Sequence, residues 1–398
     1  MSETLITLLK QAIQKDGPLP LDRFMEMALY HPEQGYYEST AHQVGREGDF
    51  QTSVSIGPLL GRLLLHQFLD WQPEAAEWQW VECGAHHGQL AEDMLQAHQA
   101  LPAGKWPALN YLIFEPSSKR RHIQQERLRR FGNQVHWVET WDQLAGSFQQ
   151  GVLFSNELMD AMPVRRYQWS RPQKQWLEMR VGQAASGFDW VLAPCKKALR
   201  LDWISAADQK TLEGALPEGY IIEVSPAAEA WWQQAARLLK KGFLVTMDYG
   251  FKDLEKFSPS RTQGTLRTYS QHRLGDDPFE AVGQQDLTAH VDFPALERQG
   301  REQGLETHGW KSQEAFMHQC LESLLKTGQT LDAHECKHFK TLMHPEHFGH
   351  RFQVLIQQRG MRSDGSAPIH RRKSDHWEND QGGQSGQNGQ SGQSSQNG

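Results

Sequence analysis

The stretch from residue 81 to residue 90, VECGAHHGQL, constrains the fold more than any other part of the chain. It extends the apolar, β-prone segment WQWVEC, and Met94 and Leu95 follow at helical spacing, so the sequence predicts a strand, a tight loop and a helix. Gly84 and Gly88 can adopt backbone angles closed to other residues and let the main chain approach a ligand, while the first helical turn offers free N–H groups. The pattern favours a nucleotide-like ligand, although ordinary α/β packing produces it too.

The chain alternates between strands and helices from residue 78 onward, which predicts an α/β fold with a parallel sheet wound by crossover helices. The expected strands are QWVEC, NYLIFE, VHWVE, GVLFSNE, YIIEVS and FLVTMDYG, and helices are expected around 89–100, 117–131 and 226–240. Residues 164–200 have instead the pattern of antiparallel strands inserted into the wound fold. FQVLIQQR, residues 352–359, is expected to close the sheet as an edge strand.

These patterns divide the chain into four expected parts. A helical N-terminal cap covers 1–77, and a Rossmann-like core covers 78–250 with an insertion at 164–217. A C-terminal region facing the substrate, with helices, covers 251–360. The tail, 361–398, ends in a run of Gln, Gly, Ser and Asn that has nothing apolar to bury, so we expect it to be disordered.

Composition excludes several classes of partner and site. The net charge of -7 over 398 residues indicates no general attraction to nucleic acid or to anionic membranes. No run approaches the roughly 18 apolar residues of a membrane span. The N-terminal segment is unlike a secretory signal or an Arg-rich transit peptide, and we therefore expect a cytoplasmic protein. The four cysteines are scattered without a C-x-x-C pair, and no metal site is expected.

Polar side chains that follow the expected strands are the candidates for chemistry, because an open α/β sheet binds ligands beyond the carboxyl ends of its strands. Glu115 follows the second strand, where a carboxylate can accept hydrogen bonds from both ribose hydroxyls of a nucleoside-like ligand. Trp141 and Asp142 follow the third strand and could border a base. The fourth strand is followed by three polar side chains that are hard to explain as core: Asn156, Glu157 and Asp160. For Asp160, capping of a following helix is an equally simple explanation.

Eight motifs in a fixed order resemble the MidA-like methyltransferases, the family of the mitochondrial complex I assembly factor and its bacterial relatives. The motifs are FMEMALYHPEQGYY, GDFQTS, an E-x-G-x-x-x-G run, FEPSSKRRHIQ, SNELMDAMPV, VTMDYG, GTLRTYSQH and DLTAHVDF, and the likeness as a whole covers roughly residues 20–357. The resemblance implies a class I methyltransferase sheet that binds S-adenosylmethionine. The mitochondrial member has a protein arginine as its substrate, so the resemblance also implies a protein partner.

The resemblance also implies roles for individual residues. Carried over by position, Glu82, Gly84, Gly88 and Glu115 would contact the cofactor. Asn156 and Glu157 would lie beside the methyl donor, and Asp49 and Thr52 would come from a covering N-terminal loop. A carboxylate beside an arginine substrate would orient the guanidinium, and Glu157 is the first candidate for that role, with Asp160 second.

The chain departs from the family pattern at several positions. In the family loop E-x-G-P-G-x-G, Ala85 replaces the proline and His86 the middle glycine. Ser55 stands where a glutamate is expected, and Arg62 where another acid is expected. These departures leave open a binding or assembly protein that keeps the fold without the activity. A nucleotide-dependent oxidoreductase is the other alternative, and the lack of a full G-x-G-x-x-G counts against it.

Overall fold

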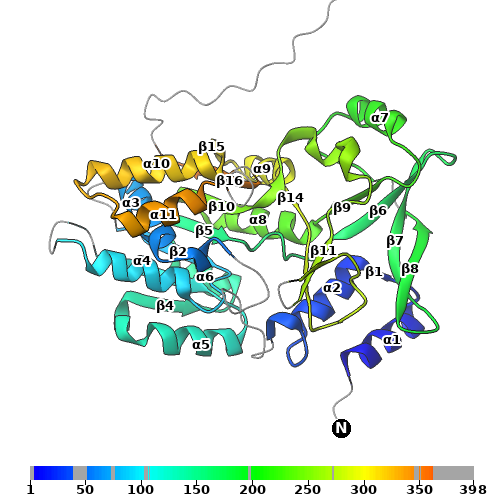
Figure 1. Ribbon diagram of the computed structural model, residues 1–398, viewed down its shortest axis with the longest axis horizontal. Coiled ribbons are helices and arrows are strands. Elements are labelled where there is room, and N and C mark those ends of the chain that lie inside the picture. Colours follow the sequence, from blue (N-terminus) through cyan, green and yellow to red (C-terminus); the bar gives the residue numbers. More distant parts are fainter. Residues whose placement is uncertain are drawn as a thin grey trace, which may run out of the picture. The chain divides into compact units, whose positions relative to one another are not determined.

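Eight strands form the central sheet of the computed structural model: β2 (Gln79–Cys83), β3 (Asn110–Phe114), β4 (Val135–Val138), β5 (Gln150–Asn156), β10 (Lys241–Phe251), β14 (Val291–Asp292), β15 (Glu306–Ser312) and β16 (Phe352–Arg359). Their order is β15-β16-β10-β5-β2-β3-β4, with β14 paired to the end of β10 (Figure 1). The chain runs from β2 outward to β3 and β4, and then returns to β5 on the other side of β2. The order therefore reverses at β2, and such a switch point is where an open α/β sheet binds ligands.

The structure describes residues 4–38, 52–72, 77–102, 106, 108–195, 199–270, 273–344, 349 and 351–361. These residues belong to one compact unit, Met1–Asp364. The low-complexity tail from residue 362 onward, for which disorder is expected, lies outside them, and the division into four parts stays a prediction. No helix within the described ranges is long and apolar enough to cross a membrane.

Helices cover both faces of the central sheet. Successive strand residues point to opposite faces, so Trp80 and Phe154 belong to one buried cluster while Val81 and Leu153 belong to the other. The first face is covered by α3 (Leu59–Trp71), α4 (Gln89–Gln99), α5 (Ser118–Leu128), α10 (Gln313–Lys326) and α11 (Ala333–Leu342). The second face is covered by α6 (Trp141–Ser147), α8 (Pro226–Leu238) and α9 (Phe293–Glu302). Burial on both sides explains why the parallel strands read as nearly continuous apolar runs.

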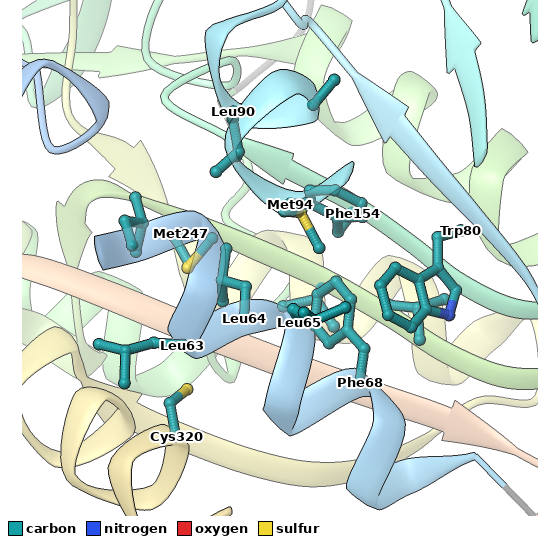
Figure 2. Close-up of a cluster of buried hydrophobic side chains, with 14 of the residues drawn as sticks. Leu63, Leu64, Leu65, Phe68, Trp80, Leu90, Met94, Phe154, Met247 and Cys320 are labelled. Atoms are coloured by element: carbon teal, nitrogen blue, oxygen red, sulfur yellow. The ribbon is translucent and has the colours of Figure 1, made fainter. Parts of the chain in front are cut away.

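Phe68 of α3 is packed among aromatic rings of the first face. Its ring centroid lies 5.1 Å from that of Phe154 and 5.5 Å from that of Trp80, both in edge-to-face geometry. Figure 2 shows these rings beside Leu65 and Met94, which come from α3 and α4. The long apolar helix after residue 58 is therefore a core element rather than a surface cover.

We expect Phe68→Ala to lower the free energy of unfolding by about 3–5 kcal/mol, because truncation leaves a cavity among rigid rings. Leu325→Ala is the control, since this α10 side chain is 49% exposed and its loss should change stability by no more than about 0.5 kcal/mol. Denaturant unfolding followed by tryptophan fluorescence measures both variants. Similar losses in the two would contradict the packing described here.

A second sheet contains the inserted strands. β6 (Arg165–Ser170), β7 (Gln175–Gln183) and β8 (Phe188–Pro194) pair antiparallel, which confirms the predicted insertion. The two-residue strand β1 (Leu19–Pro20) and β9 (Ile221–Val224) also belong to this sheet. α7 (Ala206–Ala215) lies in the same part of the sequence and buries no residue.

The N-terminal helices pack against this second sheet. α1 (Leu5–Asp16) and α2 (Leu21–Tyr30) bury Leu9 and Phe24 in one cluster with Val181 and Phe188 of the inserted strands. The rings of Phe24 and Phe188 are 5.7 Å apart. A three-stranded sheet of β11 (Arg267–Ser270), β12 (Arg273–Gly275) and β13 (Asp286–Thr288) contributes to the same cluster. Short helices complete the description: η1 (Tyr36–Glu38), η2 (Val54–Ile56), η3 (Arg129–Gln134), η4 (Asp253–Phe257) and η5 (Pro259–Arg261).

Two expected strands occupy different places. YIIEVS was expected in the wound sheet, but β9 pairs antiparallel with β6, because Ile222 packs with Tyr167 and Trp169 in a separate cluster. FQVLIQQR was expected at an edge, but β16 lies between β10 and β15. The edge is taken by β15, whose polar sequence ETHGWKS is only half-buried and gave no strand signal.

Candidate active site

A cavity of about 1160 Å³ lies at the carboxyl ends of β2, β3 and β5. Gly84 and His86 contribute from the loop after β2, Glu115 and Arg120 from the segment after β3, and Glu157 from the segment after β5. Aromatic and apolar side chains complete much of the wall: Tyr30, Tyr37, Phe114, Trp141, Leu158 and Trp231. The cavity therefore sits at the switch point of the sheet.

The structure brings only some of the predicted site residues to the cavity wall, namely Gly84, Glu115, Trp141 and Glu157. Others are described but are not part of the wall: Thr52, Glu82, Gly88, Asp142, Asn156 and Asp160. Asp49 lies outside the described residues. The wall thus combines one predicted residue from each of four strand ends, those of β2, β3, β4 and β5.

The glycine loop keeps its turn despite the histidine in it. Gly84 has φ +74°, which favours glycine, and a Cβ there would lie 2.8 Å from Leu158 Cδ1, so any other residue would also have to displace the Leu158 side chain. His86 itself has φ +48°, a left-handed conformation that costs a residue with a side chain roughly 1–2 kcal/mol. Its carbonyl oxygen accepts a hydrogen bond of 2.9 Å from Gln124 Nε2, and the Gly88 N–H donates to the Ala85 carbonyl. The loop therefore holds the shape that a middle glycine would adopt, at a cost in strain.

Glu115 presents a fixed carboxylate to the cavity. Its Oε1 accepts from the Ser117 N–H and its Oε2 from Gln124 Nε2, both at 3.0 Å. The Gln124 amide is itself fixed, because its Oε1 accepts from Trp137 Nε1 at 3.0 Å. Burial raises the pKa of Glu115, and these donors oppose the rise. One glutamine thus links the carboxylate to the backbone of the glycine loop, a link that no sequence pattern indicated.

Glu157 is held in a strained conformation directly after β5. Its φ is +51°, and its N–H donates to the Met247 carbonyl at 2.9 Å. Glu157 Oε1 accepts three hydrogen bonds, from the Ser53 N–H (3.0 Å), Ser53 Oγ (2.6 Å) and Asn156 Nδ2 (3.0 Å). Burial raises the pKa of Glu157 despite these donors. Among the described residues no donor contacts Oε2, so this oxygen remains for a ligand in the cavity.

Asp248, at the end of β10, shapes the turn that carries Glu157. Its Oδ2 accepts from the backbone N–H groups of Leu158 (3.1 Å), Met159 (2.8 Å) and Asp160 (3.3 Å). Burial raises the pKa of Asp248 to about 7. The sequence offered only the motif VTMDYG as a signal for this residue.

Asp160 lies behind the cavity wall in an acidic environment. Burial, followed by the charges of Asp248 and Asp286, holds its pKa well above the ordinary value. Its carbonyl accepts from the Ala289 N–H at 2.9 Å. Residues 157–164 form bends and a short turn with no helix, and β6 begins at Arg165, so the alternative explanation of Asp160 as a helix cap is wrong.

The start of α5 holds the segment after α2 against the core. Arg120 Nη2 donates to the Tyr37 carbonyl, Lys119 Nζ to the Pro32 carbonyl, and Ser117 Oγ to Glu38 Oε2. Tyr37 in turn donates from its hydroxyl to Asp286 Oδ1 at 2.8 Å. Neither Arg120 nor Tyr37 was predicted to be a site residue.

The other two departures from the family pattern have structural partners away from the cavity. Arg62 forms an ion pair with Glu335 of α11 and donates to Gln329 Oε1 at 2.8 Å. Ser55 and Thr52 exchange hydrogen bonds of 3.1 Å between the backbone N–H of each and the side-chain oxygen of the other. Neither Arg62 nor Ser55 lines the cavity.

A model of the family described as "Putative S-adenosyl-L-methionine-dependent methyltransferase" matches residues 59–311. The chain belongs to this family. Its class I fold, its enzymatic class and its cofactor follow from this membership, and the oxidoreductase and non-enzymatic alternatives are set aside. The departures in the glycine loop therefore occur within a methyltransferase.

Relatives and solved structures agree with this assignment. The chain is 27% identical over 317 residues to the mouse (Mus musculus) mitochondrial protein arginine methyltransferase NDUFAF7, covering 72% of this chain and 67% of the relative. The Drosophila melanogaster homologue is 25% identical, with 90% of this chain and 85% of the relative covered. The crystal structure of a likely methyltransferase from Burkholderia thailandensis, bound to S-adenosyl-homocysteine, superposes on this chain with a TM-score of 0.77 at 29% identity. The match covers 90% of this chain and 92% of that one.

The expected cytoplasmic location is contradicted, because the curated relatives are named as mitochondrial proteins. The expectation rested on the mixed charges and amphipathic pattern of the first residues. In the structure this pattern has a different cause, since Leu5, Leu9 and Ile13 of α1 are buried in the fold. The amphipathic pattern of α1 therefore results from packing and does not indicate in which cellular compartment the protein is found.

The cavity has the groups that S-adenosylmethionine requires. Phe114 and Trp141, with ring centroids 4.6 Å apart, form an aromatic wall suited to an adenine. Glu115 is a fixed acceptor for hydroxyl groups, and Gly84 leaves room where a side chain would clash. A volume of about 1160 Å³ exceeds that of most single-ligand pockets, so it has space for the cofactor and part of an acceptor.

Glu82 makes the stability of the protein depend on pH. It is buried behind the loop, accepts from the Tyr111 hydroxyl at 2.7 Å, and its pKa is raised by burial from the ordinary 4.5 to about 7. The folded cofactor-free protein therefore retains a proton that the unfolded chain releases, and the stability contributed by this group falls as the pH rises through this window. The full change is roughly 3 kcal/mol.

We expect Glu82→Gln to remove this slope, so that the variant gains stability relative to wild type between about pH 5 and pH 8. Urea unfolding of both proteins at several pH values measures the difference. A constant difference across the range would contradict the raised pKa of Glu82.

Proposed function

We propose that this methyltransferase transfers a methyl group to an arginine side chain of a protein. The observation that carries the proposal is the half-buried Glu157 carboxylate at the cavity wall, whose Oε1 accepts from three donors while no donor among the described residues contacts Oε2. A positive-φ residue other than glycine is a strained feature, and such strain concentrates at functional sites. The arginine specificity in the names of the curated relatives supports the same acceptor.

The proposed chemistry depends mainly on positioning. Bound S-adenosylmethionine supplies a methyl group on a sulfonium, which is an excellent leaving group. Glu157 Oε2 would accept a charge-assisted hydrogen bond from the guanidinium and so orient one of its nitrogens toward the methyl donor. Because burial raises its pKa, Glu157 is also a better proton acceptor than an ordinary carboxylate when the nitrogen is methylated. Asp160 lies behind it, where burial and the neighbouring carboxylates of Asp248 and Asp286 raise the pKa of Asp160 and favour its neutral form.

The cofactor contacts are part of the proposal. Glu115 accepts hydrogen bonds from the ribose hydroxyls, Trp141 borders the adenine, and the loop from Gly84 to Gly88 borders the amino-acid end. Asn156 acts from behind the wall by donating to Glu157, whereas Glu82 accepts from the buried Tyr111 hydroxyl and stays a candidate without a described contact to the wall. Asp142 and Thr52 do not line the cavity and stay candidates for binding the cofactor.

A protein acceptor agrees with the outer part of the cavity. Its wall continues along the cap, where Asp16 and Glu26 are exposed and Asp22 pairs with Arg165 at 2.7 Å. Basic side chains such as Arg23 line the same cavity, so the charges of this wall are mixed and its exposed carboxylates can contact a basic chain segment only locally. An arginine side chain is long and narrow enough to enter from this side.

We expect Glu115→Ala to weaken binding of S-adenosylhomocysteine by at least about tenfold, because two hydroxyl groups lose a charged acceptor. The control is Glu126→Ala, because Glu126 is an exposed glutamate on α5, the helix that follows Glu115 in the chain. Isothermal titration calorimetry measures both affinities. Unchanged binding by the Glu115 variant would refute the ribose assignment.

We expect Glu157→Gln to reduce methyl transfer to protein by roughly 100-fold while leaving S-adenosylhomocysteine affinity unchanged, because the loss falls on the acceptor side. Transfer of tritium-labelled methyl groups to extract proteins, followed by hydrolysis and amino-acid analysis, measures the rate and identifies the modified residue. In wild type the rate should fall on acidification through a pKa above the ordinary glutamate value.

Glu139→Gln is the matched control, since this side chain is half-exposed and pairs with Arg121 outside the cavity. Label recovered in a residue other than methylated arginine would rule out the proposed acceptor. Equal rates for wild type and the Glu157 variant would rule out the role of that carboxylate.

A further inference from the structure

Arg120 is a buried cation at the wall of the cavity. It is the third residue of α5, its residue surface is only 9% exposed, and it lines the cavity together with His86 and Glu115. No feature of the sequence marked it, because it lies in the basic run KRR that reads as a solvated helix face. The structure places it inside instead.

The guanidinium of Arg120 lacks an anionic partner. Nη2 donates to the Tyr37 carbonyl, and the guanidinium carbon lies 5.4 Å from the centroid of the Tyr37 ring. Nη1 is buried without a hydrogen-bond partner, and Arg120 forms no ion pair with any residue that the structure describes. Glu115 is the carboxylate that feels the charge of Arg120, but no ion pair joins them, and a buried Nη1 without a bonded acceptor is costly, so this arrangement favours an anion in the cavity.

The surroundings indicate where that anion lies. The charge of Arg120 lowers the pKa of His86, although burial is the larger cause, and it also opposes the rise in the pKa of Glu115. Arg120 therefore acts on the space between the glycine loop and the ribose carboxylate. Both oxygens of Glu115 already accept from Ser117 and Gln124, and no ion-pair contact joins Glu115 to Arg120. His86, held at φ +48°, is the other wall of this space.

We propose that Arg120 Nη1 binds the carboxylate of the cofactor's amino-acid end, across from His86 of the glycine loop. This inference rests on the cofactor of the family and on the placement of the ribose at Glu115. In α/β sheets, anionic groups are bound at the glycine loop by backbone N–H groups. In this chain a charged side chain from α5 adds to that site, which accounts for a loop that carries a histidine in place of its middle glycine.

Two ligands that differ in this one group test the proposal. S-adenosylhomocysteine carries the carboxylate, whereas 5′-methylthioadenosine has the same adenosine and thioether without the amino-acid end. We expect Arg120→Gln to weaken S-adenosylhomocysteine binding by roughly 10- to 100-fold, as for loss of a hydrogen-bonded charge pair, with 5′-methylthioadenosine affinity changed less than about twofold. Arg120→Lys should recover part of the loss, because the charge remains.

Arg127→Gln is the control on the same helix, where the side chain pairs with Glu92 of α4 at 2.9 Å and does not reach the cavity. Calorimetric titration of wild type and the three variants with both ligands gives all affinities, and retained 5′-methylthioadenosine binding shows that the pocket is folded. An equal loss for both ligands, or no loss for either, would overturn the proposal. Failure of wild type to bind S-adenosylhomocysteine would instead overturn the cofactor placement on which it rests.

Discussion

The proposed acceptor side of the site depends on the Asp248 carboxylate, which accepts hydrogen bonds from three consecutive backbone N–H groups. A turn after a buried strand would otherwise leave these N–H groups unsatisfied, and each such group costs about 1–3 kcal/mol. Asp248 fixes the backbone of this turn, and Ser53 fixes the side chain of Glu157. Because both are held, Glu157 can persist at positive φ. The strain is thus stored in one residue and balanced by contacts from two other segments.

The cofactor side has a comparable organising group in Gln124. Its amide receives a hydrogen bond from Trp137, and donates both to the Glu115 carboxylate and to the His86 carbonyl. This explains how the loop accommodates a histidine, since the backbone shape is imposed by a helix outside the loop. Arg120, one turn earlier on the same helix, contacts the cap. One face of α5 therefore connects the loop, the carboxylate and the N-terminal segment.

The sequence predicted the parts of this molecule that depend on local pattern. Parallel strands buried on both faces read as apolar runs, and polar residues just beyond them, such as Glu115 and Glu157, were found because strand ends meet at one edge. Ser53 was missed because its partner Glu157 lies 104 residues away, and nothing local distinguishes it from a loop serine. β15 was missed for a different reason, since a polar, half-buried edge strand with a register shift between Thr307 and Gly309 lacks apolar alternation.

The position of β16 has a consequence for the order in which the chain can fold. This strand, the last that the structure describes, pairs with β10 from Phe352 to Arg359 and with β15 on its other side. Until these residues leave the ribosome, β10 and β15 present unpaired edges and Phe352, Val354 and Ile356 are missing from the first core cluster. The nascent chain must therefore hold an incomplete sheet through most of its synthesis, a state in which binding by a chaperone would compete with edge-to-edge association.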